Sequence, residues 1–173
     1  MSIKKLKIIS ALSIFLLSFL VHYGYEIFPC FFTSIFFPIN ESLFEHMKLI
    51  TTCYLIWGFI EYKLLNNKTN FKSNLIISIF FNITIFLIIF YPIYLNFDHN
   101  LLVTLSIYLI TIIITQILSY FILKNNKEIF LNKYFYIIII IIILINIIFT
   151  YNPINNNFFI DYMNKKIGFS NYY

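Results

Sequence analysis

The sequence predicts an all-α integral membrane protein: a bundle of five transmembrane helices with the N-terminus inside and the C-terminus outside. Apolar residue types make up 61% of the 173 residues, and charged residues only 11%, against about 25% charged in an average soluble domain. The apolar total of about 105 residues suffices for five spans of roughly 20 residues. The apolar runs do not alternate with polar residues, which argues against a barrel. This composition excludes a soluble domain, a disordered chain and a nucleic-acid-binding module.

The first predicted span covers residues 8–28 and follows three lysines. This start is similar to a signal peptide, but no pair of small residues that would mark a cleavage site follows, so we interpret it as an uncleaved helix. Pro29 ends it, because proline cannot continue the helical hydrogen bonds. Residues 30–41 form an apolar loop that is expected to dip into the bilayer or lie along its surface.

The remaining spans follow from further apolar runs. The second begins beside Ser42, and Ser42 with Glu45 three residues later has the spacing of a capping box, in which each side chain accepts the other residue's amide. All belong to one predicted membrane domain, 1–173, with spans at 8–28, 43–65, 75–94, 101–123 and 134–151 and a polar outer tail at 152–173. Span 4 also carries a mild polar stripe, which we interpret as helix–helix hydrogen bonding: Thr111, Thr115, Gln116 and Ser119.

Lysine positions predict the orientation. Nine of the twelve lysines fall on one side of a five-span chain, and the positive-inside rule assigns that side to the cytoplasm. They are Lys4, Lys5, Lys7, Lys63, Lys68, Lys72, Lys124, Lys127 and Lys133. Heavy use of Ile, Asn, Lys, Phe and Tyr, with no Arg, is typical of A/T-rich bacterial genomes. We therefore expect a bacterial plasma-membrane protein with the lipid bilayer as its partner and no nucleic-acid partner; a homo-oligomer or another membrane partner stays open.

The acidic residues and histidines fall on the opposite, outer side of this arrangement. Ionisable groups near the apolar region are costly and suggest a functional site by default. The residues on the outer side are Glu26, Glu41, Glu45, Asp98 and Asp161 with His22, His46 and His99. Helical spacing aligns His22 with Tyr25 and Glu26 on one face, and Glu41 with Glu45 and Lys48 on another. Because the connecting loop is short, the two faces are expected to meet in one polar cluster.

The run at residues 37–49, FPINESLFEHMKL, resembles the signature P-[VI]-N-E-S-x-[WF]-E-H-x-K-L. That signature is typical of an uncharacterised family of short multi-span bacterial membrane proteins. The resemblance extends to His22 and Tyr25 late in the first helix, and to a tail segment with Asp161. Phe44 stands where the family usually has Trp, and the tail is poorer in Pro, Thr and Gly. The resemblance implies no established activity. Tyr25 and Lys48, which helical spacing already places near the cluster, are joined there by Asn40 and Asp161, which the resemblance adds.

Three interpretations of the cluster stay open. The first is a metal site with ligands His22, Glu26 and His46, since imidazole and carboxylate suit Zn²⁺ and similar ions. Glu41, Glu45 and Ser42 would then be the catalytic residues of a hydrolase that acts on a lipid or peptide at the outer leaflet, with a metal-bound water as the nucleophile. The second is a non-enzymatic subunit for small-solute binding or transport, and the third is an accessory protein whose cluster is structural. A Ser42 nucleophile with His46 as its base, and a Glu45–Lys48 ion pair, are also compatible with the spacing.

Overall fold

The computed structural model describes residues 1–96, 101–125, 127–161 and 166–171. Asp98 and His99, which the sequence assigns to the outer side, lie outside these ranges. The chain divides into two compact units, each described by itself. Unit 1 comprises Met1–Leu16 and Tyr54–Phe135, and unit 2 comprises Leu17–Cys53 and Tyr136–Tyr173. The prediction of one membrane domain over the whole length stays a prediction.

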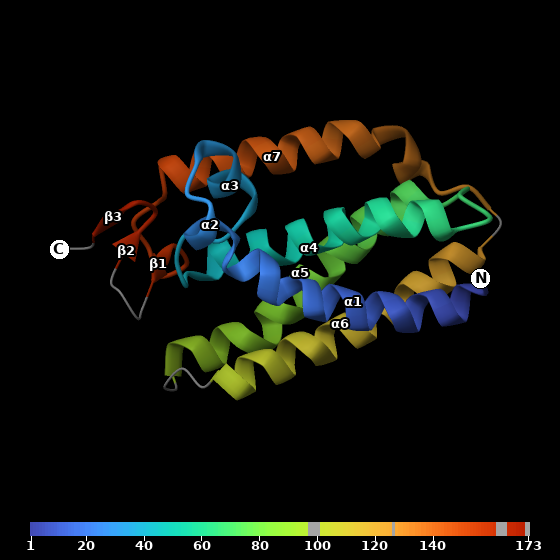
Figure 1. Ribbon diagram of the computed structural model, residues 1–173, viewed down its shortest axis with the longest axis horizontal. Helices are drawn as coiled ribbons and strands as arrows, with labels where there is room; N and C mark the ends of the chain where they lie inside the picture. Colours follow the sequence, from blue (N-terminus) through green and yellow to red (C-terminus); the bar gives the residue numbers. More distant parts are fainter. Residues whose placement is uncertain (97–100, 126, 162–165, 172–173) are drawn as a thin grey trace. The chain divides into compact units, whose positions relative to one another are not determined.

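The described chain is almost entirely helical, as the composition predicts (Figure 1). Three strands of two residues each, near the C-terminus, are the exception. The elements are α1 (Ile3–His22), α2 (Gly24–Ile27), α3 (Phe31–Phe36), α4 (Leu43–Leu64), α5 (Phe71–Asn96), α6 (Leu101–Lys124), the 3₁₀ helix η1 (Phe130–Tyr134), α7 (Phe135–Tyr151), β1 (Ile160–Asp161), β2 (Lys166–Ile167) and β3 (Ser170–Asn171).

The prediction of one continuous helix over residues 8–28 is wrong. α1 ends at His22, and the separate short helix α2 begins at Gly24. The reason lies in tertiary packing: a Cβ on Gly24 would lie only 2.4 Å from Cδ2 of Phe37, so the ring occupies the space that any other side chain would need. His22 therefore ends one helix, whereas Tyr25 and Glu26 belong to the next.

In unit 1, α5 and α6 pack against each other (Figure 1). A buried amide lies between them: the Asn82 Nδ2 donates to the Tyr54 hydroxyl at 3.2 Å and to the Thr115 Oγ1 at 3.1 Å. Asn70, just before α5, links its segment to the one that follows α6, because the Asn70 Nδ2 donates to the carbonyl of Asn125 at 2.7 Å. The predicted role of span 4's polar stripe in helix–helix hydrogen bonding is thus confirmed at Thr115.

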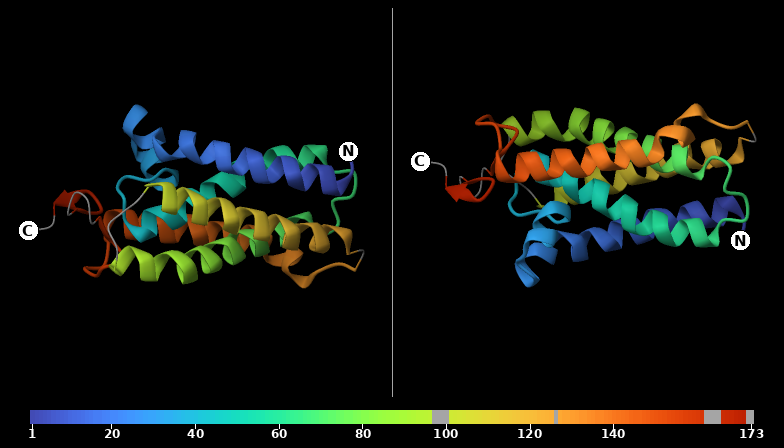
Figure 2. Two further views of the ribbon diagram at one scale, coloured as in Figure 1. Left: turned by 90° about the horizontal axis from the view of Figure 1, so that it is seen from below. Right: turned by 90° about the horizontal axis from the view of Figure 1, so that it is seen from above.

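In unit 2, the C-terminal tail folds back after α7 (Figure 2). Its strands form a small antiparallel sheet in the order β1-β2-β3, with Ile160 opposite Ile167. Gly168 forms the tight turn with a φ of +54°, and an added Cβ would lie 2.9 Å from the carbonyl oxygen of Thr150. Phe159 and Ile167 bury their side chains against Phe44 at the start of α4. The tail predicted only as polar therefore covers the region of the candidate cluster.

The long helices bury polar residues and expose apolar ones. In α7 the buried residues include Asn146 and Thr150, whereas Ile141 and Leu144 are exposed. A water-soluble fold shows the opposite preference, since large apolar patches on soluble monomers are uncommon. Among the described residues, four helices are long and apolar enough to cross a membrane: Ile3–His22, Phe71–Tyr94, Leu101–Lys124 and Phe130–Tyr151. The protein therefore has the architecture of a membrane protein.

Candidate functional site

The loop before α4 is closed by local hydrogen bonds. The amide of Ser42 donates to the Oδ1 of Asn40 at 3.0 Å, and the Ser42 Oγ accepts the amide of Glu45 at 3.4 Å. Only half of the predicted capping box is therefore present. The predicted second hydrogen bond, from the Ser42 amide to the Glu45 carboxylate, does not form. The Ser42 amide donates to Asn40 instead, and the Glu45 carboxylate has a charged partner.

That partner is Lys48, as the i, i+3 spacing predicts. The Lys48 Nζ lies 2.6 Å from the Glu45 Oε2, and both side chains are almost completely buried. The ammonium also donates to the Ser34 carbonyl at 2.8 Å and to the Thr150 Oγ1 at 3.0 Å. An ammonium has three donors, so all three are used. The same carboxylate oxygen accepts the amide of Ile39 at 3.0 Å, which fixes the loop against the helix.

Glu41 lies between the two histidines of the cluster. Its Oε1 is 3.1 Å from the Nε2 of His22, and its Oε2 is 3.8 Å from the Nε2 of His46. The prediction that the end of the first helix meets the start of the second is thus confirmed at this contact. Unlike the Glu45–Lys48 pair, these side chains are partly open to solvent, with exposed fractions of 35% for Glu41, 30% for His22 and 15% for His46. This part of the cluster is the one that a ligand can reach.

The ring of His46 is oriented by the backbone of its own helix. Its Nδ1 lies 2.9 Å from the Ser42 carbonyl oxygen. A carbonyl only accepts, so the Nδ1 must carry the proton, and in a neutral imidazole the Nε2 then keeps its lone pair. This lone pair faces Glu41. An Nδ1–H bond to a backbone carbonyl is also the arrangement that orients many metal-binding histidines.

The tail supports Glu41 from the other side. The Asp161 Oδ2 accepts the backbone amide of Glu41 at 3.2 Å, and Asp161 is completely buried. At the turn between β2 and β3, the carbonyl of Gly168 accepts a hydrogen bond from the Asn40 Nδ2 at 3.1 Å. Asn40 and Asp161 thus both hold in place the loop before α4.

Other predicted members lie apart from this arrangement. Within the part of the chain that the structure describes, no hydrogen bond or ion pair joins the exposed Glu26 to the cluster, although its charge acts on His22 through space. Tyr25 packs edge-on against Phe169. The hydroxyl of Ser42 faces the Glu45 amide, and His46 contacts the Ser42 carbonyl instead of its hydroxyl. In the described ranges, no three His, Cys, Asp or Glu side chains form a group close enough to hold a metal ion as they stand.

Several contributors could not be found by motif reading. The Ser34 carbonyl and the Ile39 amide are backbone groups, which any residue would supply. Thr150 offered one signal: with Asn146 four residues before it, it is a rare polar residue in an isoleucine-rich helix. Such a pair marks the buried face of a span, since polar side chains in a bilayer turn toward other helices.

A family model described as a family of unknown function, DUF6512, matches residues 1–169. The chain belongs to this family. The match covers nearly the whole chain and confirms the resemblance to an uncharacterised family that residues 37–49 indicate. No curated protein and no solved structure matches the chain. Membership in the DUF6512 family thus assigns no activity, and the geometry of the His22–Glu41–His46 cluster is the basis for a proposed function.

Proposed function

We propose that this family member is a five-span protein of a bacterial plasma membrane, with the N-terminus in the cytoplasm and the C-terminus outside. The span added to the four apolar helices is α4, the second in chain order, which is 22 residues long but carries four charged residues. Two of them, Glu45 and Glu61, are buried and paired with Lys48 and Lys7 respectively. Pairing removes most of the penalty for an isolated charge in a bilayer. Lys63 lies at the end of the helix, where its long side chain can extend to the interface.

The proposed activity centres on His22, Glu41 and His46, as a site that binds a divalent metal ion such as Zn²⁺. The observation that supports it is the Glu41 carboxylate, which reaches the Nε2 atoms of both histidines from a partly open position. Two imidazoles and a carboxylate are a common donor set of catalytic zinc sites. Ligands of a tetrahedral zinc ion lie roughly 3.3 Å apart at the usual bond lengths of about 2.0–2.1 Å. The two nitrogen–oxygen distances of 3.1 and 3.8 Å bracket that separation. The three side chains would have to move closer together to bind the ion, since no three of the described His, Cys, Asp or Glu side chains form such a group as they stand.

A metal ion with an open coordination position would lower the pKa of a bound water and supply a hydroxide nucleophile. His22, Glu41 and His46 would hold the ion, and the hydroxide that it supplies would suit hydrolysis of a lipid or peptide at the outer leaflet. Glu45 and Ser42 take no direct part in this step, because both are almost completely buried. They instead position the loop that carries Glu41.

Metal analysis of the purified protein tests this proposal. We expect about one equivalent of a divalent ion per chain, strongly reduced in His22→Ala, His46→Ala and Glu41→Gln. The matched control is Glu26→Gln, which changes an exposed carboxylate whose charge acts on His22 but which no described hydrogen bond or ion pair joins to the site. A protein that stays metal-free after incubation with zinc, or equal loss in the Glu26 control, would contradict the metal site and with it the hydrolase.

A non-enzymatic role is the second candidate, as an accessory or solute-binding subunit whose cluster is structural. The saturated hydrogen bonding of Lys48 favours it. If the substitutions at His22 and His46 lower the unfolding temperature without any change in metal content, the structural role is supported. A comparison of lipids between a deletion strain and its parent then separates an enzyme from an accessory protein.

A further inference from the structure

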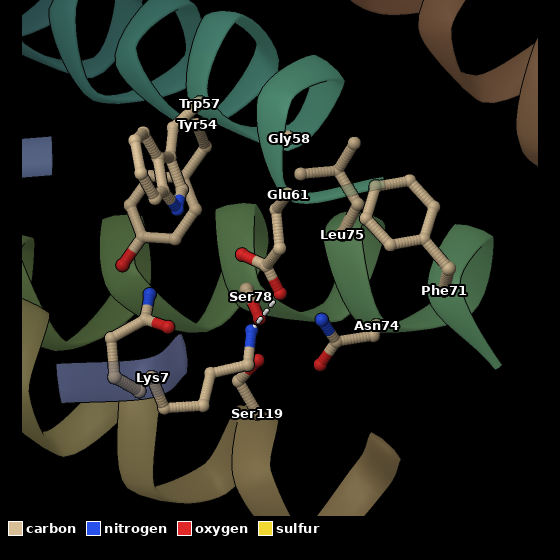
Figure 3. Close-up of a pocket in the computed structure, with 11 residues that line it drawn as sticks. Lys7, Tyr54, Trp57, Gly58, Glu61, Phe71, Asn74, Leu75, Ser78 and Ser119 are labelled. Atoms are coloured by element: carbon tan, nitrogen blue, oxygen red, sulfur yellow. Dashed lines mark hydrogen bonds and ion pairs between the residues drawn. The ribbon is translucent and has the colours of Figure 1, made fainter. Parts of the chain in front are cut away.

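Unit 1 contains a second polar feature, in a cavity among α1, α4, α5 and α6 (Figure 3). The room inside it for water-sized molecules is about 10 Å³, enough for about one water. Lys7 and Glu61 reach into it from α1 and α4, and we call it the Lys7–Glu61 cavity. It belongs to a different unit from the histidine cluster and takes no part in the function proposed above.

The ion pair in the cavity has unused hydrogen-bonding capacity. The Lys7 ammonium donates to the Glu61 Oε1, and the Ser10 hydroxyl donates to the Glu61 Oε2 at 3.2 Å. Among the described residues Glu61 is the acceptor for Lys7, so two of the three ammonium donors lack a partner. The buried Lys48 shows the contrast, because three acceptors satisfy its three donors.

Other buried polar groups line the same space without partners. The atoms are the Nε1 of Trp57, the Oδ1 of Asn74, the Oγ of Ser78, the Oε1 of Gln116 and the Oγ of Ser119. Each side chain is at least nine-tenths buried, and none of these atoms has a hydrogen-bond partner among the described residues. Native proteins pair roughly 90% or more of their buried polar groups. Five unpaired groups around one cavity therefore point to an occupant.

The chemistry of the lining indicates what this occupant is. Trp57 and Lys7 offer donors, Asn74 and Gln116 offer acceptors, and the serine hydroxyls serve as either. The ammonium of Lys7 disfavours a cation and the carboxylate of Glu61 disfavours an anion, so a neutral molecule fits best. Water is neutral, has both donors and acceptors, and fits the available room. We propose that the Lys7–Glu61 cavity is a buried hydration site, in which ordered water joins the ion pair to these unpartnered polar groups.

Cysteine accessibility tests the hydration of the cavity. The variant Ser119→Cys is made in a Cys53→Ala background, purified, and treated with methyl methanethiosulfonate. Only a thiolate reacts, and a thiol ionises in water but not in lipid or a dry core. Although Ser119 is 1% exposed, we expect it to react at least about tenfold faster than Ile117→Cys on the outer face of the same helix, which is 55% exposed but faces lipid in the proposed membrane. The native exposed Cys30 serves as the internal reference for the reagent.

If Ser119→Cys reacts no faster than Ile117→Cys, the cavity is dry and the proposal is overturned. Ser78→Cys, on α5, repeats the measurement should Ser119→Cys fold poorly.

Discussion

Replacing Lys48 by methionine removes the most highly connected side chain of the cluster while keeping its approximate length. The substitution eliminates the three hydrogen bonds of the ammonium, to Glu45 Oε2 at 2.6 Å, Ser34 O at 2.8 Å and Thr150 Oγ1 at 3.0 Å. It leaves the buried Glu45 carboxylate with the Ile39 amide as its remaining donor. Removing one partner of a buried pair costs about 3–5 kcal/mol, because the other charge stays uncompensated.

For a chain of this length, each kcal/mol corresponds to about 2–4 °C in unfolding temperature. The lower end of the cost, about 3 kcal/mol, therefore predicts a decrease of about 6–12 °C for Lys48→Met. Thermal unfolding of the detergent-solubilised protein, followed by size-exclusion chromatography, measures it. Lys63→Met on the same helix is the matched control. That lysine is exposed, and its ammonium lies over the Phe59 ring, 4.2 Å from the ring centroid, so the variant should lose at most about 1 kcal/mol, well below the loss in Lys48→Met.

The double variant Glu45→Met with Lys48→Met separates charge from packing. Removing both charges should recover at least half of the lost stability, since well-packed apolar residues often replace a buried pair without loss. A decrease below about 2 °C in Lys48→Met, or a double variant as unstable as the single one, would refute the reasoning that an uncompensated carboxylate dominates the cost.

Three further predictions concern the loops of unit 2. Gly168→Ala should lower the free energy of unfolding by about 1–2 kcal/mol in thermal unfolding, because the left-handed φ and the Thr150 carbonyl both oppose a Cβ. The hydrogen bond from Thr33 lowers the pKa of the exposed Cys30 thiol, so Thr33→Val should move the midpoint of the pH–rate curve for maleimide labelling to higher pH, whereas Thr33→Ser should not. Labelling of Cys30 by a membrane-impermeant maleimide in intact cells also tests the outer location of this loop. Asp161→Ala should cost about 1–3 kcal/mol, since it leaves the partly buried Glu41 amide without its acceptor.

The sequence predicts the helices well because bilayer spans are specified by local composition. The predicted spans 43–65 and 101–123 differ from α4 (Leu43–Leu64) and α6 (Leu101–Lys124) by one residue at most at each end. The end of α1 at His22 escaped prediction, because the ring of Phe37 that requires Gly24 comes from a later segment. Periodicity within one helix carries no information about such a contact.

The candidate site divides in the same way. The Glu45–Lys48 pair follows from spacing within one helix, and the meeting of His22 with Glu41 follows from a short loop. The return bond of the capping box failed because Asn40, two residues before Ser42, competes successfully for the Ser42 amide. Local motifs predict which groups are available, but competition among partners decides which bonds form.

Charge pairing also explains how α4 can serve as a fifth span in the proposed topology although it is less apolar than the other long helices. α4 is absent from the four helices that qualify by apolar composition, since its ends carry Glu45, Lys48 and Glu61. Each unit neutralises its own part of this helix: Lys48 pairs with Glu45 in unit 2, and Lys7 pairs with Glu61 in unit 1. A hydropathy sum counts each charge at its full cost, whereas a paired and hydrogen-bonded charge costs much less in a bilayer. A charged helix between apolar spans should therefore be tested for partners before it is assigned to water.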